Sequence, residues 1–222
     1  MPVLFDPSSQ SHLRQETSHK VLDRRVRSDE EEDEKPSAEM SESVPAGKAL
    51  WKARIVLLTG EVNDKQAHRV GATLLALAAE NADPITLVLS SPGGHVESGD
   101  MIHDMIKFVT PRVRILGTGW VASAGALIFA AAAREDRFCL PNTRFLLHEP
   151  RGGVGGAASD VQIQAREILR MRERLNRIFA AATGQTYERI KADTDRDYWM
   201  QATEAVEYGL VGKVVNNQSE IG

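Results

Sequence analysis

The sequence predicts an α/β fold built around a parallel sheet. Three apolar runs with strand character cover residues 54–60, 85–90 and 113–116, and each precedes a segment of helical spacing or composition. A further apolar run, 145–148, follows the turn at Pro141-Asn142. Repeated alternation of strands and helices is typical of parallel sheets with right-handed crossovers.

The helices are recognised by their apolar faces and by the residues at their ends. We expect helices over about 64–81, 96–109, 124–133, 161–183, 187–191 and 204–208, and short strands over 137–140 and 213–215. Asn63 or Asp64 can cap the first helix, and Gly184 closes the fourth. The fourth helix is about 35 Å long at the usual rise per residue, more than a domain of this size needs. We therefore expect it to protrude and to pack against a partner.

The acidic residues are concentrated at the N-terminus. Residues 1–45 hold 11 acidic and 6 basic side chains, out of 31 and 27 in the chain of 222 residues, so the remainder is nearly neutral. Such a segment buries too little apolar area to offset the entropy lost on ordering. We expect residues 1–48 to be a disordered acidic leader or propeptide, and residues 49–222 to form one domain.

Several classes of protein are excluded by what the sequence lacks. No apolar run reaches the roughly 18 residues that a membrane span requires, and residues 1–10 carry no secretory signal. The nearly neutral domain offers no basic surface for nucleic acid. The chain has a single cysteine, Cys139, and neither a P-loop nor a metal-ligand set. We expect a cytoplasmic protein without a cofactor or bound metal.

A lone serine, Ser123, lies between a strand and an apolar helix. It can be a helix N-cap or a nucleophile, and a nucleophile needs a base. Of six histidines, His148 stands where an apolar strand ends, and the carboxyl ends of parallel strands share one edge of a sheet. The loop Gly93-Gly94 follows another strand. We therefore expect this loop, Ser123 and His148 to meet in one crevice.

The same crevice can stabilise a developing negative charge. Glycines let the backbone approach a substrate, so the N–H groups of Gly94 and Ala124 can form an oxyanion hole. A carboxylate that orients the histidine would complete a triad. The residues alone leave six candidates for it: Asp100, Asp136, Asp160, Asp193, Asp195 and Asp197.

Motifs spread over about residues 50–217 point to one family. They are Ser90-Ser91-Pro92-Gly93-Gly94, Ala122-Ser123-Ala124-Gly125-Ala126, Leu140-Pro141-Asn142, His148-Glu149-Pro150, Ala158-Ser159-Asp160, Glu167-Ile168-Leu169-Arg170, Asp193-Thr194-Asp195-Arg196-Asp197 and Ala205-Val206-Glu207-Tyr208-Gly209-Leu210. In content and order they resemble the proteolytic subunit family of the Clp protease. The resemblance implies a serine endopeptidase that cleaves unfolded proteins inside an oligomeric chamber.

The resemblance also implies roles for single residues. Ser123 would be the nucleophile, His148 the general base and Asp197 its orienting carboxylate, with Gly94 and Ala124 as oxyanion donors. The fold would be a crotonase-like β-α superhelix, in which helix 161–183 is a handle that interlocks two heptameric rings into a tetradecamer. Asp195 and Arg196 would couple the rings to activity. A separate AAA+ ATPase would unfold the substrates.

Three departures from the family pattern leave alternatives open. Ala124 replaces the usual methionine, Trp120 replaces a small or polar residue, and the family's N-terminal gate is not recognisable in residues 1–49. The unfamiliar N-terminus leaves open a catalytically weak or regulatory subunit in a mixed Clp ring. Another alternative is an acyl-CoA enzyme, since crotonase-type enzymes share the implied fold and an oxyanion hole.

Overall fold

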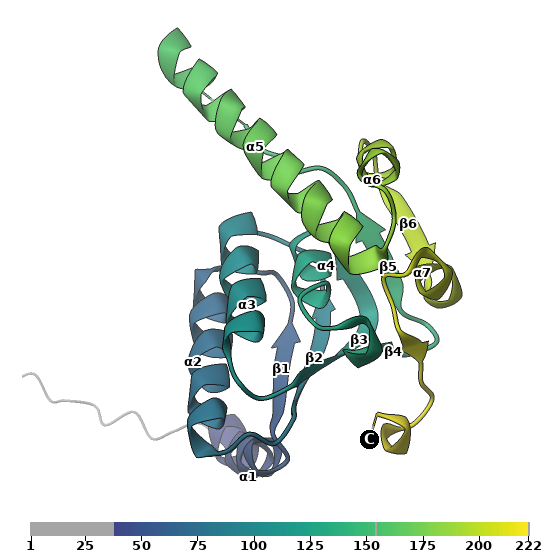
Figure 1. The fold of residues 1–222 in the computed structure, drawn as a ribbon. Coiled ribbons are helices and arrows are strands. Elements are labelled where there is room, and N and C mark those ends of the chain that lie inside the picture. The colour runs from purple at the N-terminus through teal and green to yellow at the C-terminus, as the bar shows by residue number, and fades with distance from the viewer. Residues whose placement is uncertain (1–37, 154, 222) are drawn as a thin grey trace, which may run out of the picture. The chain divides into compact units, whose positions relative to one another are not determined.

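The computed structural model describes residues 38–153 and 155–221 (Figure 1). Its α-helices are α1 (Ala38–Lys52), α2 (Asp64–Glu80), α3 (Val96–Phe108), α4 (Ala124–Phe129), α5 (Ala158–Thr183), α6 (Tyr187–Asp193) and α7 (Ala202–Tyr208). Its strands are β1 (Ile55–Thr59), β2 (Ile85–Ser91), β3 (Val113–Ala122), β4 (Arg137–Cys139), β5 (Arg144–Leu147), β6 (Tyr198–Gln201) and β7 (Lys213–Val214).

The strands form one mostly parallel sheet, which confirms the predicted α/β class. Its order is β1-β2-β3-β4-β7, and β5 pairs with both β3 and β6. Strand β3 changes partner along its length, because Ile115 to Gly117 pair with β4 whereas Trp120 to Ala122 pair with β5. The pair β5–β6 is antiparallel. The carboxyl ends of β2, β3 and β5 consequently lie side by side.

Helices α2 and α4 pack on the sheet, and α3 packs against both of these helices (Figure 1). Leu74 and Leu77 of α2 and Leu87 and Leu89 of β2 are fully buried in the hydrophobic core, as is Ile115 of β3. Each such side chain stabilises the fold by about 1.5–3 kcal/mol. The carboxyl ends of the central strands are thus attached to a well-packed layer.

Two predicted element boundaries were wrong. The strand expected over 113–116 continues to Ala122. The helix expected over 124–133 ends at Phe129, although Ala130, Ala131 and Ala132 stay buried. An apolar run indicates that residues are buried but does not show whether they are helical. Here the last residues of the run turn toward β4 instead of continuing the helix. Helix α1 spans Ala38–Lys52, so its first residues belong to the segment 1–48. The division of the chain into a leader and a domain stays a prediction. The expectation for residues 1–37 lies outside the described residues.

Helix α5 protrudes from the rest of the domain, as expected (Figure 1). Its buried residues, Leu175, Asn176, Phe179 and Thr183, all belong to its C-terminal half. The N-terminal half exposes apolar side chains, with Ile163 57% and Leu169 61% exposed. Among the helices of the described residues, α5 included, none is long and apolar enough to cross a membrane.

Candidate active site

Ser123 follows the last residue of β3 and adopts a backbone conformation that residues other than glycine rarely adopt. Its φ is 54° and its ψ is −119°, which costs on the order of 1–3 kcal/mol. Its N–H donates to the carbonyl oxygen of Leu146 at 2.9 Å. Ser123 stands at the N-cap position of α4, but its side chain forms no cap hydrogen bond, so the hypothesis that the hydroxyl serves as a cap was wrong. The strained turn instead directs the hydroxyl toward His148, whose Nε2 lies 2.8 Å from Oγ.

Of the two glycines after β2, Gly93 lies against Ser123 and Gly94 lies against Val62. Ser91 pairs with Val121, which places Gly93 beside Ser123. Gly93 has a φ of 98°, and a Cβ on it would lie 2.6 Å from the Cβ of Ser123. Gly94 has a φ of 144°, and a Cβ there would lie 2.2 Å from the carbonyl oxygen of Val62. Only glycine fits either position without displacing backbone or the serine.

The two N–H groups expected to form the oxyanion hole lack acceptors. The parallel bridge between Val62 and Gly94 uses the groups on either side of Gly94 and leaves its own N–H unused. Ala124 is the first residue of α4, where an N–H has no acceptor within the helix. Within the described part of the chain neither N–H donates to a protein acceptor. Both N–H groups are therefore free to donate to a ligand.

The antiparallel register of β5 and β6 brings Asp197 to His148. Leu147 pairs with Tyr198, so the residue that follows β5 and the residue that precedes β6 face each other. His148 Nδ1 lies 3.0 Å from Asp197 Oδ1. The histidine side chain is 14% exposed, whereas that of Asp197 is 42% exposed. One imidazole therefore joins a hydroxyl to a carboxylate, with both ring nitrogens in hydrogen bonds.

Of the six candidate aspartates, Asp197 is the one that the described structure joins to His148. Four others are paired with arginines: Asp100 with Arg174, Asp136 with Arg112, Asp193 with Arg189, and Asp195 with Arg172. Asp160 lies in the first turn of α5. The signal that separates Asp197 is strand β6, which sequence reasoning missed because it is a four-residue strand at the sheet edge.

Two basic residues that sequence reasoning did not single out lie next to this group. Arg151 donates from Nη2 to Oδ1 of Asp197. Arg172 of α5 lies 3.1 Å from the carboxylate of Glu149 and 3.0 Å from that of Asp195. Residues on both sides of the His148–Asp197 contact are thus held by ion pairs.

Other groups that could act as a base or a nucleophile are bound to other partners or are buried. His95 Nδ1 contacts the hydroxyl of Ser98 at 2.8 Å, but that hydroxyl donates to Asp64 at 2.6 Å, so the proton of this serine is directed away from the imidazole. The hydrogen bond from Ser98 lowers the pKa of Asp64. Burial raises the pKa of the Cys139 thiol to about 12, which makes it a poor nucleophile. His12 and His19 lie outside the described residues.

A serine, a histidine and an aspartate hydrogen-bonded in this order on an α/β fold are the side-chain arrangement of serine hydrolases. The comparisons with known proteins narrow this class. The model of the Clp protease family matches residues 38–218. The chain belongs to the Clp protease family.

Curated relatives and solved structures agree with this assignment. The chain is 55% identical over 197 residues to ATP-dependent Clp protease proteolytic subunit 3 of Rhizobium etli, covering 87% of this chain and 99% of the relative. It is 59% identical over 174 residues to subunit 2 of Gluconobacter oxydans, covering 78% of each chain. The solved structure of ClpP1 from Listeria monocytogenes matches with a TM-score of 0.73 and 49% identity, covering 80% of this chain and 99% of that one.

Proposed function

We propose that this chain is the proteolytic subunit of an ATP-dependent Clp protease, a serine endopeptidase that hydrolyses peptide bonds of unfolded proteins. The family membership supports a serine peptidase, and the relatives that it matches over nearly their whole length are named as proteolytic subunits. The observation that carries the residue assignment is the hydrogen-bonded chain Ser123–His148–Asp197. A single cysteine agrees with a reducing cytoplasm.

The reaction follows from the positions of the three side chains. Ser123 Oγ bonds to the carbonyl carbon of the substrate while its proton passes to His148 Nε2. The C–N bond then breaks, and His148 gives this proton to the departing amine, leaving an acyl group on Ser123. Water repeats the sequence and releases the acid. Asp197 holds the proton on Nδ1 and stabilises the imidazolium that forms in each step.

The oxyanion formed in each step needs donors on the other side of the carbonyl. The unused N–H groups of Gly94 and Ala124 suit this role. Gly94 follows Gly93, which lies against Ser123, and Ala124 follows Ser123 directly in the chain. Losing one such donor typically raises the barrier by about 3–4 kcal/mol. Since the donor is backbone, alanine at position 124 keeps the function that methionine would have there.

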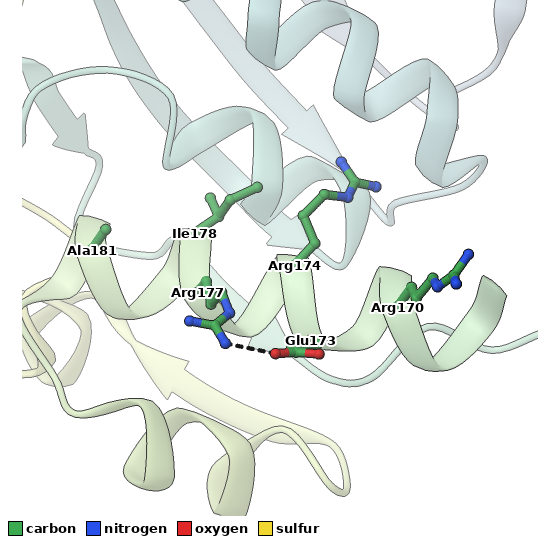
Figure 2. A pocket seen from close by; sticks show the side chains of 6 residues that line it. All are labelled: Arg170, Glu173, Arg174, Arg177, Ile178 and Ala181. Atoms are coloured by element: carbon green, nitrogen blue, oxygen red, sulfur yellow. Dashed lines mark hydrogen bonds and ion pairs between the residues drawn. The ribbon is translucent and has the colours of Figure 1, made fainter. Parts of the chain in front are cut away.

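We further propose that the subunit forms heptameric rings, paired into a tetradecamer, and works with an AAA+ ATPase. Membership of the family implies oligomeric assembly with Clp ATPases. Arg174 anchors α5 to α3 through two 2.6 Å hydrogen bonds to Asp100, and the half of α5 beyond this anchor protrudes. Figure 2 shows side chains of α5, from Arg170 to Ala181, that line a hollow near this anchor. The volume of the hollow is about 430 Å³. The protruding half exposes Ile163 and Leu169 and suits contact with the same helix of the opposite ring.

Arg196 gives a test of the assembly. Its neighbour Asp195 is paired with Arg172 in the same chain, whereas Arg196 is exposed and forms no ion pair among the described residues. Arg196→Ala should weaken ring pairing and lower peptidase activity per subunit at least about tenfold, because truncating one partner of a buried interfacial charge pair costs about 2–5 kcal/mol. Sedimentation velocity and peptide hydrolysis measure both, with Lys191→Ala as the exposed-charge control. Unchanged sedimentation would count against the coupling role.

The two alternatives are weaker. A regulatory subunit in a mixed ring is not favoured, because the relatives are named as proteolytic subunits and the hydrogen-bonded serine is intact. An acyl-CoA enzyme has no support from the family model, whose description is a protease.

The proposal is tested by labelling the native protein with a fluorophosphonate and weighing the intact assembly and its peptides. We expect one adduct per chain, located on Ser123, in a particle of several subunits. Heat-denatured protein is the control, since an activated serine reacts only in the folded site. An unlabelled native protein, or an adduct on another residue, would contradict the assignment.

A further inference from the structure

One carboxylate oxygen in the site accepts two hydrogen bonds from the same short segment. Oδ1 of Asp197 accepts from Nδ1 of His148 and also from Nη2 of Arg151, three residues later. The Arg151 side chain is 62% exposed and Asp197 is 42% exposed. The reaction as derived above uses the imidazole contact and gives no role to the guanidinium.

The contact between Arg151 and Asp197 is one of several hydrogen bonds and ion pairs that connect residues 148–151 to residues 194–197. The N–H of Glu149 donates to the carbonyl oxygen of Thr194 at 2.7 Å. The Glu149 side chain pairs with Arg172, which also pairs with Asp195. The hydrogen bond from Arg151 to Asp197 is the last of these interactions along the segment 148–151. Beyond it the chain enters a glycine-rich stretch, where Gly152, Gly153 and Gly155 have no heavy atom within 4 Å of a Cβ position.

Asp197 benefits from a second hydrogen-bond donor because its side chain is partly exposed to water. A carboxylate held by one imidazole donor can rotate and hydrate its oxygens, which would release the Nδ1 hydrogen bond that fixes the tautomer. A charged second donor on the same oxygen resists that rotation, and charge-assisted hydrogen bonds are about twice as strong as neutral ones. The charge also has a cost, because it opposes a positive imidazolium nearby. Water screens both interactions at this exposed site, but Arg151 is in direct contact with Asp197, so the orienting effect is the larger.

We propose that Arg151 is a positioning residue, which holds the Asp197 carboxylate in the orientation that accepts the proton on Nδ1 of His148. The inference rests on the proposed roles of Ser123, His148 and Asp197. It predicts that Arg151 acts on the rate of the chemical step and acts through Asp197. Substrate affinity should change little.

The test is a set of variants measured with a short fluorogenic peptide. Arg151→Leu should lower kcat about three- to fivefold with KM within about twofold, in line with the strength of exposed ion pairs. Arg151→Gln and Arg151→Lys should each recover part of the loss, since each keeps a donor. Arg189→Leu breaks another arginine–aspartate pair, in which Arg189 is 55% exposed and Asp193 14% exposed, and serves as the control.

A double-mutant cycle separates positioning from a structural role. In an Asp197→Ala background, Arg151→Leu should change kcat less than about 1.5-fold, because the group through which it acts is gone. Sedimentation must show the same assembly for every variant. The proposal is overturned if Arg151→Leu leaves kcat unchanged, raises it, changes only KM, or lowers it equally without Asp197. Full activity of Ser123→Ala would instead refute the proposed function itself.

Discussion

Replacing Ser123 with alanine is expected to lower kcat/KM for a fluorogenic peptide by at least about 10⁴-fold. Removing the nucleophile of a Ser-His-Asp group costs on the order of 10⁶ in kcat elsewhere, and the residual rate comes from binding and the oxyanion hole. Alanine and serine are similarly strained at a φ of 54°, and the serine side chain forms no cap bond. The variant should therefore fold and assemble like the native protein.

Ser98→Ala is the matched control for this variant. Ser98 also has its hydroxyl 2.8 Å from a histidine nitrogen and bonded to an aspartate, but on α3 and not at His148. We expect its peptidase activity to stay within about threefold, with a stability loss of about 1 kcal/mol from the lost hydrogen bond. Undiminished hydrolysis by Ser123→Ala, with a purified chain free of other peptidases, would rule out the nucleophile.

The second large effect is expected from Gly93→Ala. The new Cβ would lie 2.6 Å from the Cβ of Ser123 and 2.9 Å from the carbonyl oxygen of Ala122, and alanine is disfavoured at a φ of 98°. Overpacking of this kind costs about 1–3 kcal/mol, and a shift of about 1 Å at a reacting group can cost about 10²-fold in rate. We expect kcat/KM to fall about 100-fold and the thermal midpoint to fall as well.

Gly152→Ala isolates the effect of the position from that of losing a glycine. No heavy atom lies within 4 Å of a Cβ at Gly152, and its φ is not positive. Its activity should stay within about twofold of the native value. If kcat/KM of Gly93→Ala equals the native value, the Gly93-Gly94 loop can shift without moving Ser123. The loop would then not hold an oxyanion donor in a fixed position.

The residue pattern alone predicted those site residues whose positions are determined by the ends of parallel strands. Ser123, His148 and Gly93-Gly94 each follow an apolar run, and the ends of parallel strands meet at one edge whatever the exact register. Asp197 depends on a register between two four-residue strands, β5 and β6, that are far apart in sequence. Without the family resemblance, nothing in the residues around Asp197 distinguishes it from the five other aspartates.

The remaining differences have similarly local causes. Helix α4 was predicted too long because alanines suit a buried turn as well as a helix. The contact of Arg151 was not predicted because a long, exposed side chain can reach several carboxylates, and spacing does not choose among them. Fold class and strand ends follow from patterns that many residues share, whereas these features depend on single contacts.

The antiparallel pairing of β5 with β6 also has a consequence for the chain while it is being synthesised. Synthesis proceeds from the N-terminus, so Ser123 and His148 leave the ribosome before Asp197 and the strand that carries it into place. A nascent chain of that length has a serine and a base but no carboxylate to fix the imidazole. If Asp197 orients the imidazole as proposed, full peptidase activity requires that β6 has been made and has paired with β5.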